Sequence, residues 1–594
     1  MTPTLIPRRF DGRTLPALLR STARRCPSGA FLRAIDPADP SAPPRTVTFS
    51  SFERAVHHAA AFLRSRGVSP GDRVLFLAEN SPEWQILALG AQLLRAEPAA
   101  IFASLADEAA REIAERVRPR VAFVSGAAQW RKLEPAAERL GAAGLDTVIS
   151  AAPLPPGTPP HPIRPALAAE ACGGSLALDP AEADALVDAV TEEDPFLLLF
   201  TSGTTGRPKG VRLPQRAIVH AIEAGNAAVG LGQGDLGVHF LPLAHVAGHD
   251  QFALALAQGH ELVMVSRRED LERALSFGPT YLFSVPLVYE RIRAAVEARI
   301  RALPGPLRAL AGRSLLAAAR VRVDGSRSPW DALLARLADR LVGRAVRTRL
   351  GGRIRGLFVG GAPTPPSLFR FYEGLGIPCV ELYGMSETAG FVSSNLLAER
   401  RRPGSAGRVT RDHEVRFAED GELLLRGPLL LSGYLEPEDA VGTRTPDGFF
   451  RTGDIGRIDE EGWLRIEGRT KHLLVLSTGK KLSPEPVEQA IAASPPFLGA
   501  VLFGEGRPFV SAVVFVEPAA LERLAAEGRD PAEALLEPAR AALGAFSEYE
   551  KPKRLVVMPG SPQDHPALVT PTLKVKRAAL LSLLGPRLDA AYGG

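Results

Sequence analysis

The sequence predicts an α/β protein with a large first domain and a small second one. Short apolar runs that end in glycine, proline or polar turns alternate with helical patterns, as strands and helices do in α/β sheets. The chain has 594 residues, more than one hydrophobic core usually supports. From Asp447 onward, glycine-punctuated hairpins replace the alternation. These observations indicate at least two domains.

The strands and helices of the first domain can be placed by their apolar patterns. Strand-like runs cover residues 73–78, 196–200, 238–241, 261–265 and 354–359. Helical patterns cover residues 51–66, 81–94 and 215–229. Residues 151–178 are rich in proline and alanine, so we expect a long surface connection there.

The second domain follows a predicted hairpin. Residues 459–462 read Asp-Glu-Glu-Gly, a tight turn between the strand-like residues 456–458 and 463–466. We place the domain boundary at residues 468–471, which leaves a C-terminal domain of about 120 residues.

Composition and charge narrow the function classes. The net charge of +5 is small and no basic tract interleaved with aromatic residues occurs, which argues against a nucleic-acid partner. A weak attraction to anionic membrane surfaces stays open. No apolar run reaches the length of a membrane-spanning helix, and residues 1–20 lack the apolar core of a signal peptide. Three cysteines without metal-ligand spacing fit a reducing compartment, so we expect a cytoplasmic protein.

The most informative segment is the loop that follows the predicted strand 196–200. It combines glycines that let backbone N–H groups approach an anion, hydroxyl groups that donate hydrogen bonds, and a terminal ammonium group. These residues are Thr201, Ser202, Gly203, Thr204, Thr205, Gly206 and Lys209. We therefore expect a nucleoside triphosphate to bind here. A Walker loop is disfavoured because Gly210, rather than serine or threonine, follows Lys209.

Two further motifs lie near predicted strands. Gly360-Gly361-Ala362-Pro363 is a turn of small residues, which can lie flat against a purine ring. Tyr383-Gly384-Met385-Ser386-Glu387-Thr388 places an aromatic ring close to a carboxylate, the hard oxygen ligand that magnesium prefers. Taken alone, a tyrosine packed in the core and a surface glutamate would also explain the second motif.

Two motifs frame the second domain. Residues 450–456 contain Asp454 in a Gly-Asp pair, which an ordinary turn could also contain. Residues 569–577 contain Lys574, although lysine and arginine also protect exposed strand edges. Only nine of the 71 basic residues are lysine, and seven of the nine lie between Lys471 and Lys576. Because arginine is used almost everywhere else, the few lysines are candidates for sites that need a compact ammonium group.

In this order the motifs resemble those of the AMP-forming adenylating enzymes, and over residues 45–580 the chain is similar to the long-chain fatty acyl-CoA synthetase branch. The second likeness is carried by residues 80–84, 241–246, 284–290 and 570–577, and by an arginine-rich helical insertion over about residues 294–350. The resemblance implies a large N-terminal domain of α/β subdomains with a distorted β-barrel, and a small mobile C-terminal α/β domain. The corresponding boundaries are residues 1–468, a hinge at 469–472, and residues 473–594.

The resemblance also implies roles for individual residues. Lys574, Glu387 and Thr201 would be catalytic, with Glu387 also holding Mg²⁺, and the residues from Thr201 to Lys209 named above would bind the ATP phosphates. Adenine and ribose would be bound by Gly361, Ala362, Pro363, Tyr383, Gly384, Asp454 and Arg469. His245 would border the acyl site, Lys471 would lie at the hinge, and Gly479 would lie in the loop on the coenzyme A side.

The implied activity is the ATP-dependent conversion of a fatty acid into acyl-adenylate and then into acyl-CoA, with release of pyrophosphate and AMP. The expected ligands are ATP, Mg²⁺, a fatty acid and coenzyme A, and the oligomeric state is left open. Two positions depart from the family pattern, since His472 stands where many relatives have an acidic residue and Phe449 where tryptophan is usual.

Two alternatives remain. A fatty acyl-AMP ligase would load a carrier protein instead, but Ser-Thr-Gly-Lys-Lys-Leu-Ser-Pro at residues 477–484 favours coenzyme A as the acceptor. A catalytically silent nucleotide-binding protein would have lost the lysine or the magnesium carboxylate, and both Lys574 and Glu387 are present.

Overall fold

The computed structural model divides the chain into two compact units. It describes residues 5–36, 39, 41–160, 162–201, 207–544, 546–569 and 575–592. The first unit comprises Met1–Glu414, Leu425–Phe450 and Glu460–Trp463, and the second comprises Val415–Leu424, Arg451–Asp459 and Leu464–Gly594. The boundary at residue 468 and the hinge at 469–472 stay predictions.

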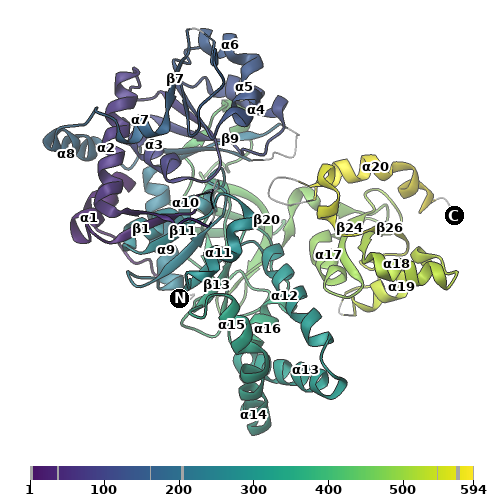
Figure 1. The fold of residues 1–594 in the computed structure, drawn as a ribbon. Coiled ribbons are helices and arrows are strands. Elements are labelled where there is room, and N and C mark those ends of the chain that lie inside the picture. Colours follow the sequence, from purple (N-terminus) through teal and green to yellow (C-terminus); the bar gives the residue numbers. More distant parts are fainter. Residues whose placement is uncertain are drawn as a thin grey trace. The chain divides into compact units, whose positions relative to one another are not determined.

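The first unit contains two large mixed sheets (Figure 1). The eight-stranded sheet has the order β19 (Gly433–Tyr434), β9 (Lys209–Pro214), β8 (Pro195–Thr201), β4 (Glu97–Ala100), β3 (Arg73–Leu77), β5 (Val121–Val124), β6 (Thr147–Ser150) and β7 (Arg164–Leu167). The nine-stranded sheet has the order β16 (Arg408–Val409), β15 (Ser393–Ser394), β14 (Cys379–Tyr383), β13 (Gly356–Val359), β12 (Tyr281–Ser284), β10 (Leu236–His239), β11 (Glu261–Met264), β1 (Ala30–Ala34) and β2 (Arg45–Thr48).

Helices surround these sheets, and each sheet packs on its own hydrophobic core. The helices of the first unit are α1 (Leu15–Arg25), α2 (Phe49–Ser65), α3 (Pro82–Leu93), α4 (Asp107–Val117), α5 (Ala127–Leu133), α6 (Ala137–Ala142), α7 (Ala168–Gly173), α8 (Pro180–Ala189), α9 (Gln215–Val229), α10 (Val246–Gln258), α11 (Leu271–Ser276), α12 (Pro286–Arg301), α13 (Gly305–Ala319), α14 (Pro329–Ala338), α15 (Arg344–Arg349) and α16 (Pro366–Gly374).

The start of α3 illustrates how the sequence sets these elements. Ser81 caps the helix by accepting a hydrogen bond from the Trp84 N–H, and Pro82 occupies the first turn, where its missing N–H costs nothing. Trp84 then packs 4.2 Å from the Phe76 ring of β3, measured between centroids. The predicted helices at 51–66, 81–94 and 215–229 are confirmed within two residues at each end.

Two sequence-based expectations need correction, one about the bounds of a strand and one about a connection. Strand β10 begins and ends two residues earlier than the predicted 238–241, since the chain turns before Pro242. The expected connection at 151–178 contains the edge strand β7 and helix α7. The sequence of β7, Arg-Pro-Ala-Leu, is not typical of a strand, because proline cannot donate a hydrogen bond to its neighbour and is uncommon away from edge strands such as this one.

The second unit is a smaller α/β body. Its strands are β20 (Phe450–Ile458), β21 (Leu464–Arg469), β22 (Leu474–Val475), β23 (Lys481–Leu482), β24 (Phe497–Phe503), β25 (Ser511–Val516) and β26 (Leu555–Pro559), with β17 (Glu414–Phe417) and β18 (Glu422–Arg426) reaching into it. Its helices are α17 (Pro484–Ala492), α18 (Pro518–Ala526), α19 (Pro531–Ala541) and α20 (Arg577–Ala590). The predicted hairpin is confirmed, with Ile458 opposite Leu464.

The distorted β-barrel is not found. Within the described residues the four-stranded sheet has the open order β17-β18-β20-β21, and a barrel needs its first and last strands to pair. No helix in the described part of the chain is long and apolar enough to cross a membrane.

Candidate functional site

The nine-stranded sheet brings two of the predicted motifs to one edge. Strands β10, β12, β13 and β14 run parallel, so their carboxyl ends lie at the same side of the sheet. The turn from Gly360 to Pro363 follows β13, and Tyr383 ends the neighbouring strand β14. The carboxyl edge of a parallel sheet is the usual place for a ligand site.

Two glycines are required by the backbone at this edge. Gly361 has a φ of +80°, in the left-handed region that favours glycine. At Gly384 a Cβ atom would lie 2.1 Å from the carbonyl oxygen of Gly390, so no side chain fits. Both glycines therefore shape the turns that flank Tyr383.

The predicted phosphate loop connects two antiparallel strands of the eight-stranded sheet. Thr201 at the end of β8 pairs with Lys209 at the start of β9. Ser202, Gly203, Thr204, Thr205 and Gly206 lie outside the described residues. The two ends of the loop are therefore adjacent, as a closed cradle needs.

Lys209 lies in a polar cluster that includes Tyr434, a residue that the sequence analysis did not select. The Lys209 ammonium group lies 3.2 Å from the Asp439 carbonyl oxygen and 5.5 Å from the centroid of the Tyr434 ring. Burial, the nearby carboxylates of Glu387 and Asp439 and a hydrogen bond to Glu387 raise the pKa of the Tyr434 hydroxyl. Tyr434 thus links the predicted magnesium ligand to the predicted phosphate lysine.

Backbone contacts hold this cluster together. The Glu387 carbonyl oxygen accepts a hydrogen bond from the Leu431 N–H, over 2.9 Å. Strand β19, which contains Tyr434, pairs with β9 beside Lys209. The structure therefore brings Glu387 and Lys209, 178 residues apart in the sequence, to one place.

His245 caps helix α10. Its Nδ1 accepts a hydrogen bond from the Ala247 N–H, over 3.2 Å. The Asn80 side chain fixes the preceding loop by bonding the Leu241 carbonyl and the Leu243 N–H, over 2.8 and 3.0 Å. This cap gives His245 a structural role, so its predicted place beside the acyl chain stays a prediction.

A buried carboxyl group lies under the Gly360 to Pro363 turn. Glu381 on β14 accepts a hydrogen bond from the Thr364 N–H, over 3.1 Å, and its other oxygen is buried without a partner among the described residues. Burial raises the pKa of Glu381 to about 7. The sequence signal was a single carboxylate inside the apolar strand Cys-Val-Glu-Leu-Tyr, which the sequence analysis did not use.

We expect the replacement of Glu381 with glutamine to remove a pH-dependent loss of stability. Between the unfolded pKa near 4.5 and the folded pKa near 7, only the folded state keeps the proton, so wild-type stability falls as the pH rises. The loss should approach about 3 kcal/mol, and E381Q should lack it. Thermal unfolding of the wild type and E381Q at about pH 5 and about pH 8 checks this. An equal stability difference between the two proteins at both pH values would contradict the prediction.

In the second unit, Asp454 and Arg469 face each other across strands β20 and β21. The Arg469 Nε lies 2.8 Å from Asp454 Oδ1, and the Asp454 side chain is only 3% exposed. The Thr452 hydroxyl supports this geometry, since it accepts from the Asp454 N–H over 3.0 Å. The structure thus brings together the two residues that the sequence analysis assigned to one nucleotide.

The remaining predicted residues also belong to the second unit. Lys471 is the exposed residue of the short turn Thr470–His472, and Gly479 has a φ of +79° in the turn between β22 and β23. His472, the departure from the family pattern, hydrogen-bonds the Glu485 carboxylate of α17. Burial opposes ionisation of Glu485, but this bond lowers its pKa overall. Lys574 lies outside the described residues.

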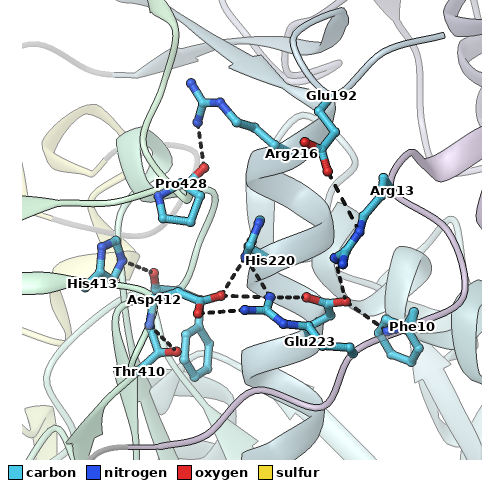
Figure 2. Close-up of polar contacts among 12 residues, drawn as sticks. Phe10, Arg13, Glu192, Arg216, His220, Glu223, Thr410, Asp412, His413 and Pro428 are labelled. Atoms are coloured by element: carbon cyan, nitrogen blue, oxygen red, sulfur yellow. Dashed lines mark hydrogen bonds and ion pairs between the residues drawn. The ribbon is translucent and has the colours of Figure 1, made fainter.

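One cluster with metal-like composition is separate from these residues. His220, Glu223 and Asp412 lie close together (Figure 2). All three contact the Arg9 guanidinium group. Arg9 donates to Asp412 over 3.0 Å, and its Nη1 lies 2.5 Å from Glu223. Arg9 thus already supplies the cation, so we interpret the cluster as a structural anchor for the N-terminal segment.

Comparisons with known proteins agree with these motifs. Residues 20–435 match the family described as AMP-binding enzyme, and residues 471–594 match the AMP-binding enzyme C-terminal domain. The long-chain-fatty-acid–CoA ligase FadD15 of Mycobacterium bovis is 32% identical over 574 residues, 92% of each chain. The long-chain-fatty-acid–CoA ligase heimdall of Drosophila melanogaster is 31% identical over 79% of this chain and 71% of its own.

Solved structures share the fold. The A domain of carboxylic acid reductase from Segniliparus rugosus, in complex with AMP and a co-purified carboxylic acid, matches with a TM-score of 0.73 and 19% identity. The match covers 98% of this chain and 94% of that one. A Mycobacterium tuberculosis fatty acyl CoA synthetase matches with a TM-score of 0.61 and 21% identity, over 97% and 99% of the two chains.

Proposed function

Because this chain belongs to the family of AMP-binding enzymes, we propose that it is a fatty acid:CoA ligase that uses ATP and releases AMP and pyrophosphate. The observation that carries the proposal is the similarity over 92% of the chain to a relative named long-chain-fatty-acid–CoA ligase. We place the enzyme in the cytoplasm, with a peripheral contact to the membrane.

In the first half-reaction, a carboxylate oxygen of the fatty acid attacks the α-phosphorus of ATP. The new P–O bond forms the acyl-adenylate, and the bond to the leaving pyrophosphate breaks. Thr201 and the loop up to Lys209 would hold the phosphates, because Thr201 and Lys209 are adjacent across β8 and β9. Lys574 would neutralise charge as the two anions approach each other.

Two groups of residues would bind the nucleotide. Tyr383 would stack on adenine beside the turn formed by Gly361, Ala362 and Pro363, with Gly384 giving the close backbone approach. Asp454 would accept hydrogen bonds from the ribose hydroxyl groups, and Arg469, 2.8 Å away, would orient its carboxylate.

Magnesium fits the donor set around Glu387. The Glu387 carboxylate is a hard oxygen ligand. Tyr434 contacts both this carboxylate and Lys209, the proposed phosphate ligand. When bound, the ion would supply positive charge to the polyphosphate. The Tyr434 hydroxyl, kept protonated, would orient the Glu387 carboxylate by donating to it.

In the second half-reaction, the sulfur of coenzyme A attacks the acyl carbon, and AMP leaves with the oxygen that bridged carbon and phosphorus. Lys471 would lie at the hinge that exchanges the two half-reactions. Gly479 would leave room for the pantetheine arm, since no atom of the described residues lies within 4 Å of the position of a Cβ atom there. His245 would border the acyl chain from the start of α10.

A test of this function measures pyrophosphate, AMP and thioester with ATP, Mg²⁺ and fatty acids of increasing chain length, with and without coenzyme A. We expect sustained turnover only with coenzyme A, and the series also gives the chain preference. Acyl-adenylate that accumulates without thioester would indicate a carrier-protein acceptor. No pyrophosphate with any acid would indicate a silent nucleotide-binding protein.

A further inference from the structure

The helical segment from α12 to the start of β13 is strongly basic. Residues 286–355 contain sixteen arginines and five acidic residues, whereas the whole chain has a net charge of only +5. The rest of the chain therefore has a net negative charge. In Figure 1, α13 and α14 extend from the first unit at the lower end of the view, away from its sheets.

Helix α14 and the turn after it carry an apolar stripe on their solvent side. Trp330, Leu333 and Leu341 are 74%, 53% and 42% exposed, and the partly buried Leu337 completes the spacing of three to four residues. The buried residues Asp331, Ala335 and Ala338 alternate with the stripe and face the protein instead. The stripe is thus a second apolar face, which the described residues of the first unit leave exposed.

Arginines flank this stripe at the same spacing. Arg336, Arg340 and Arg344 are exposed, and none has a carboxylate partner within the part of the chain that the structure describes. Neighbouring arginines are paired, as Arg320 is with Asp331 and Arg347 is with Asp339. The three unpaired guanidinium groups therefore leave positive charge beside the exposed tryptophan and leucines.

We infer that the exposed face from Trp330 to Arg344, on α14, the turn after it and the start of α15 (Arg344–Arg349), is the docking surface for an anionic lipid bilayer. Apolar side chains with tryptophan, flanked by arginines, are the combination that holds a helix in the headgroup region of a membrane. Charge complementarity selects lipids with negative headgroups. The inference does not depend on the ligase reaction, although a bilayer is also where fatty acids partition.

Tryptophan fluorescence tests this contact directly. The chain has four tryptophans, and Trp84, Trp130 and Trp463 are buried, so Trp330 alone reports on the surface. The probe is vesicles of phosphatidylcholine mixed with phosphatidylglycerol, compared with phosphatidylcholine alone, without ATP or fatty acid. We expect a blue shift and quenching by brominated acyl chains with the anionic vesicles only, both lost in W330F.

The charge requirement is tested by replacing Arg336, Arg340 and Arg344 with alanine. Vesicle binding measured by sedimentation should weaken on the order of a hundredfold, given the contribution of each basic residue near an anionic surface. The matched control replaces Arg54, Arg131 and Arg411, which are also exposed, and should bind as the wild type does. Melting temperatures of both variants show that folding is kept.

Three results would overturn the inference. The first is an unchanged Trp330 spectrum with anionic vesicles, and the second is equal weakening of vesicle binding in the control variant. The third is a dimer in sedimentation velocity that only the variant at Arg336, Arg340 and Arg344 abolishes, while vesicles fail to bind. Since the assay contains no substrates, any of them would leave the ligase proposal standing.

Discussion

Replacing Lys574 with alanine is expected to abolish acyl-adenylate formation while leaving ATP binding intact. The ammonium group would act only as the carboxylate and the α-phosphate approach, so its loss should affect the transition state far more than the bound substrate. We expect adenylation to slow by at least about a thousandfold. Pyrophosphate exchange measures the rate, and calorimetric titration with ATP measures binding.

The neighbouring Lys576 provides the matched control, since it is an exposed lysine two residues along the chain. K576A should keep wild-type adenylation. In K574A, thioester formation from chemically prepared acyl-adenylate should continue, because that step has no attack on phosphorus. Normal pyrophosphate exchange by K574A would refute the role given to Lys574.

Replacing Glu387 with glutamine is expected to remove the magnesium-dependent rate of adenylation with little effect on stability. Glutamine keeps the shape and can still bond the Tyr434 hydroxyl, but a neutral amide is a poor ligand for Mg²⁺. We expect kcat/KM for adenylation to fall by about a thousandfold and the requirement for Mg²⁺ to rise. Adenylation rates over a magnesium titration check this.

The control for Glu387 is E438Q, which changes an exposed carboxylate in the segment after Tyr434. It should reproduce the wild-type magnesium dependence. If E387Q also reproduced it, the metal would be held elsewhere and the grouping of Glu387, Tyr434 and Lys209 would have another purpose.

The sequence predicted the regular part of the fold because burial patterns are local. The apolar run at 196–200 became β8, and Gln215–Val229 became α9 with the expected ends. The apolar pattern did not predict β7, because this edge strand contains a proline, a residue that is uncommon in strands. The barrel was implied by resemblance alone, and no local pattern could show whether the strands at residues 414–469 close into one.

The sequence predicted those site residues that lie near one another in the chain and have side chains suited to the nucleotide. Asp454 and Arg469 are 15 residues apart in the sequence, and a hairpin brings them into contact. Tyr434 and Glu381 were missed because their importance depends on long-range packing. Strand pairing between β19 and β9 brings Tyr434 beside Lys209, and folding brings it into contact with Glu387. Glu381 is an ordinary carboxylate until burial raises its pKa to about 7.

The most direct test of the account follows the oxygen of the fatty acid. An acid labelled with ¹⁸O in its carboxylate is converted with ATP, Mg²⁺ and coenzyme A, and the products are analysed by mass spectrometry. Attack of the carboxylate on the α-phosphorus predicts AMP with one labelled oxygen. Labelled phosphate with ADP, or unlabelled AMP, would contradict the acyl-adenylate and with it the proposed function.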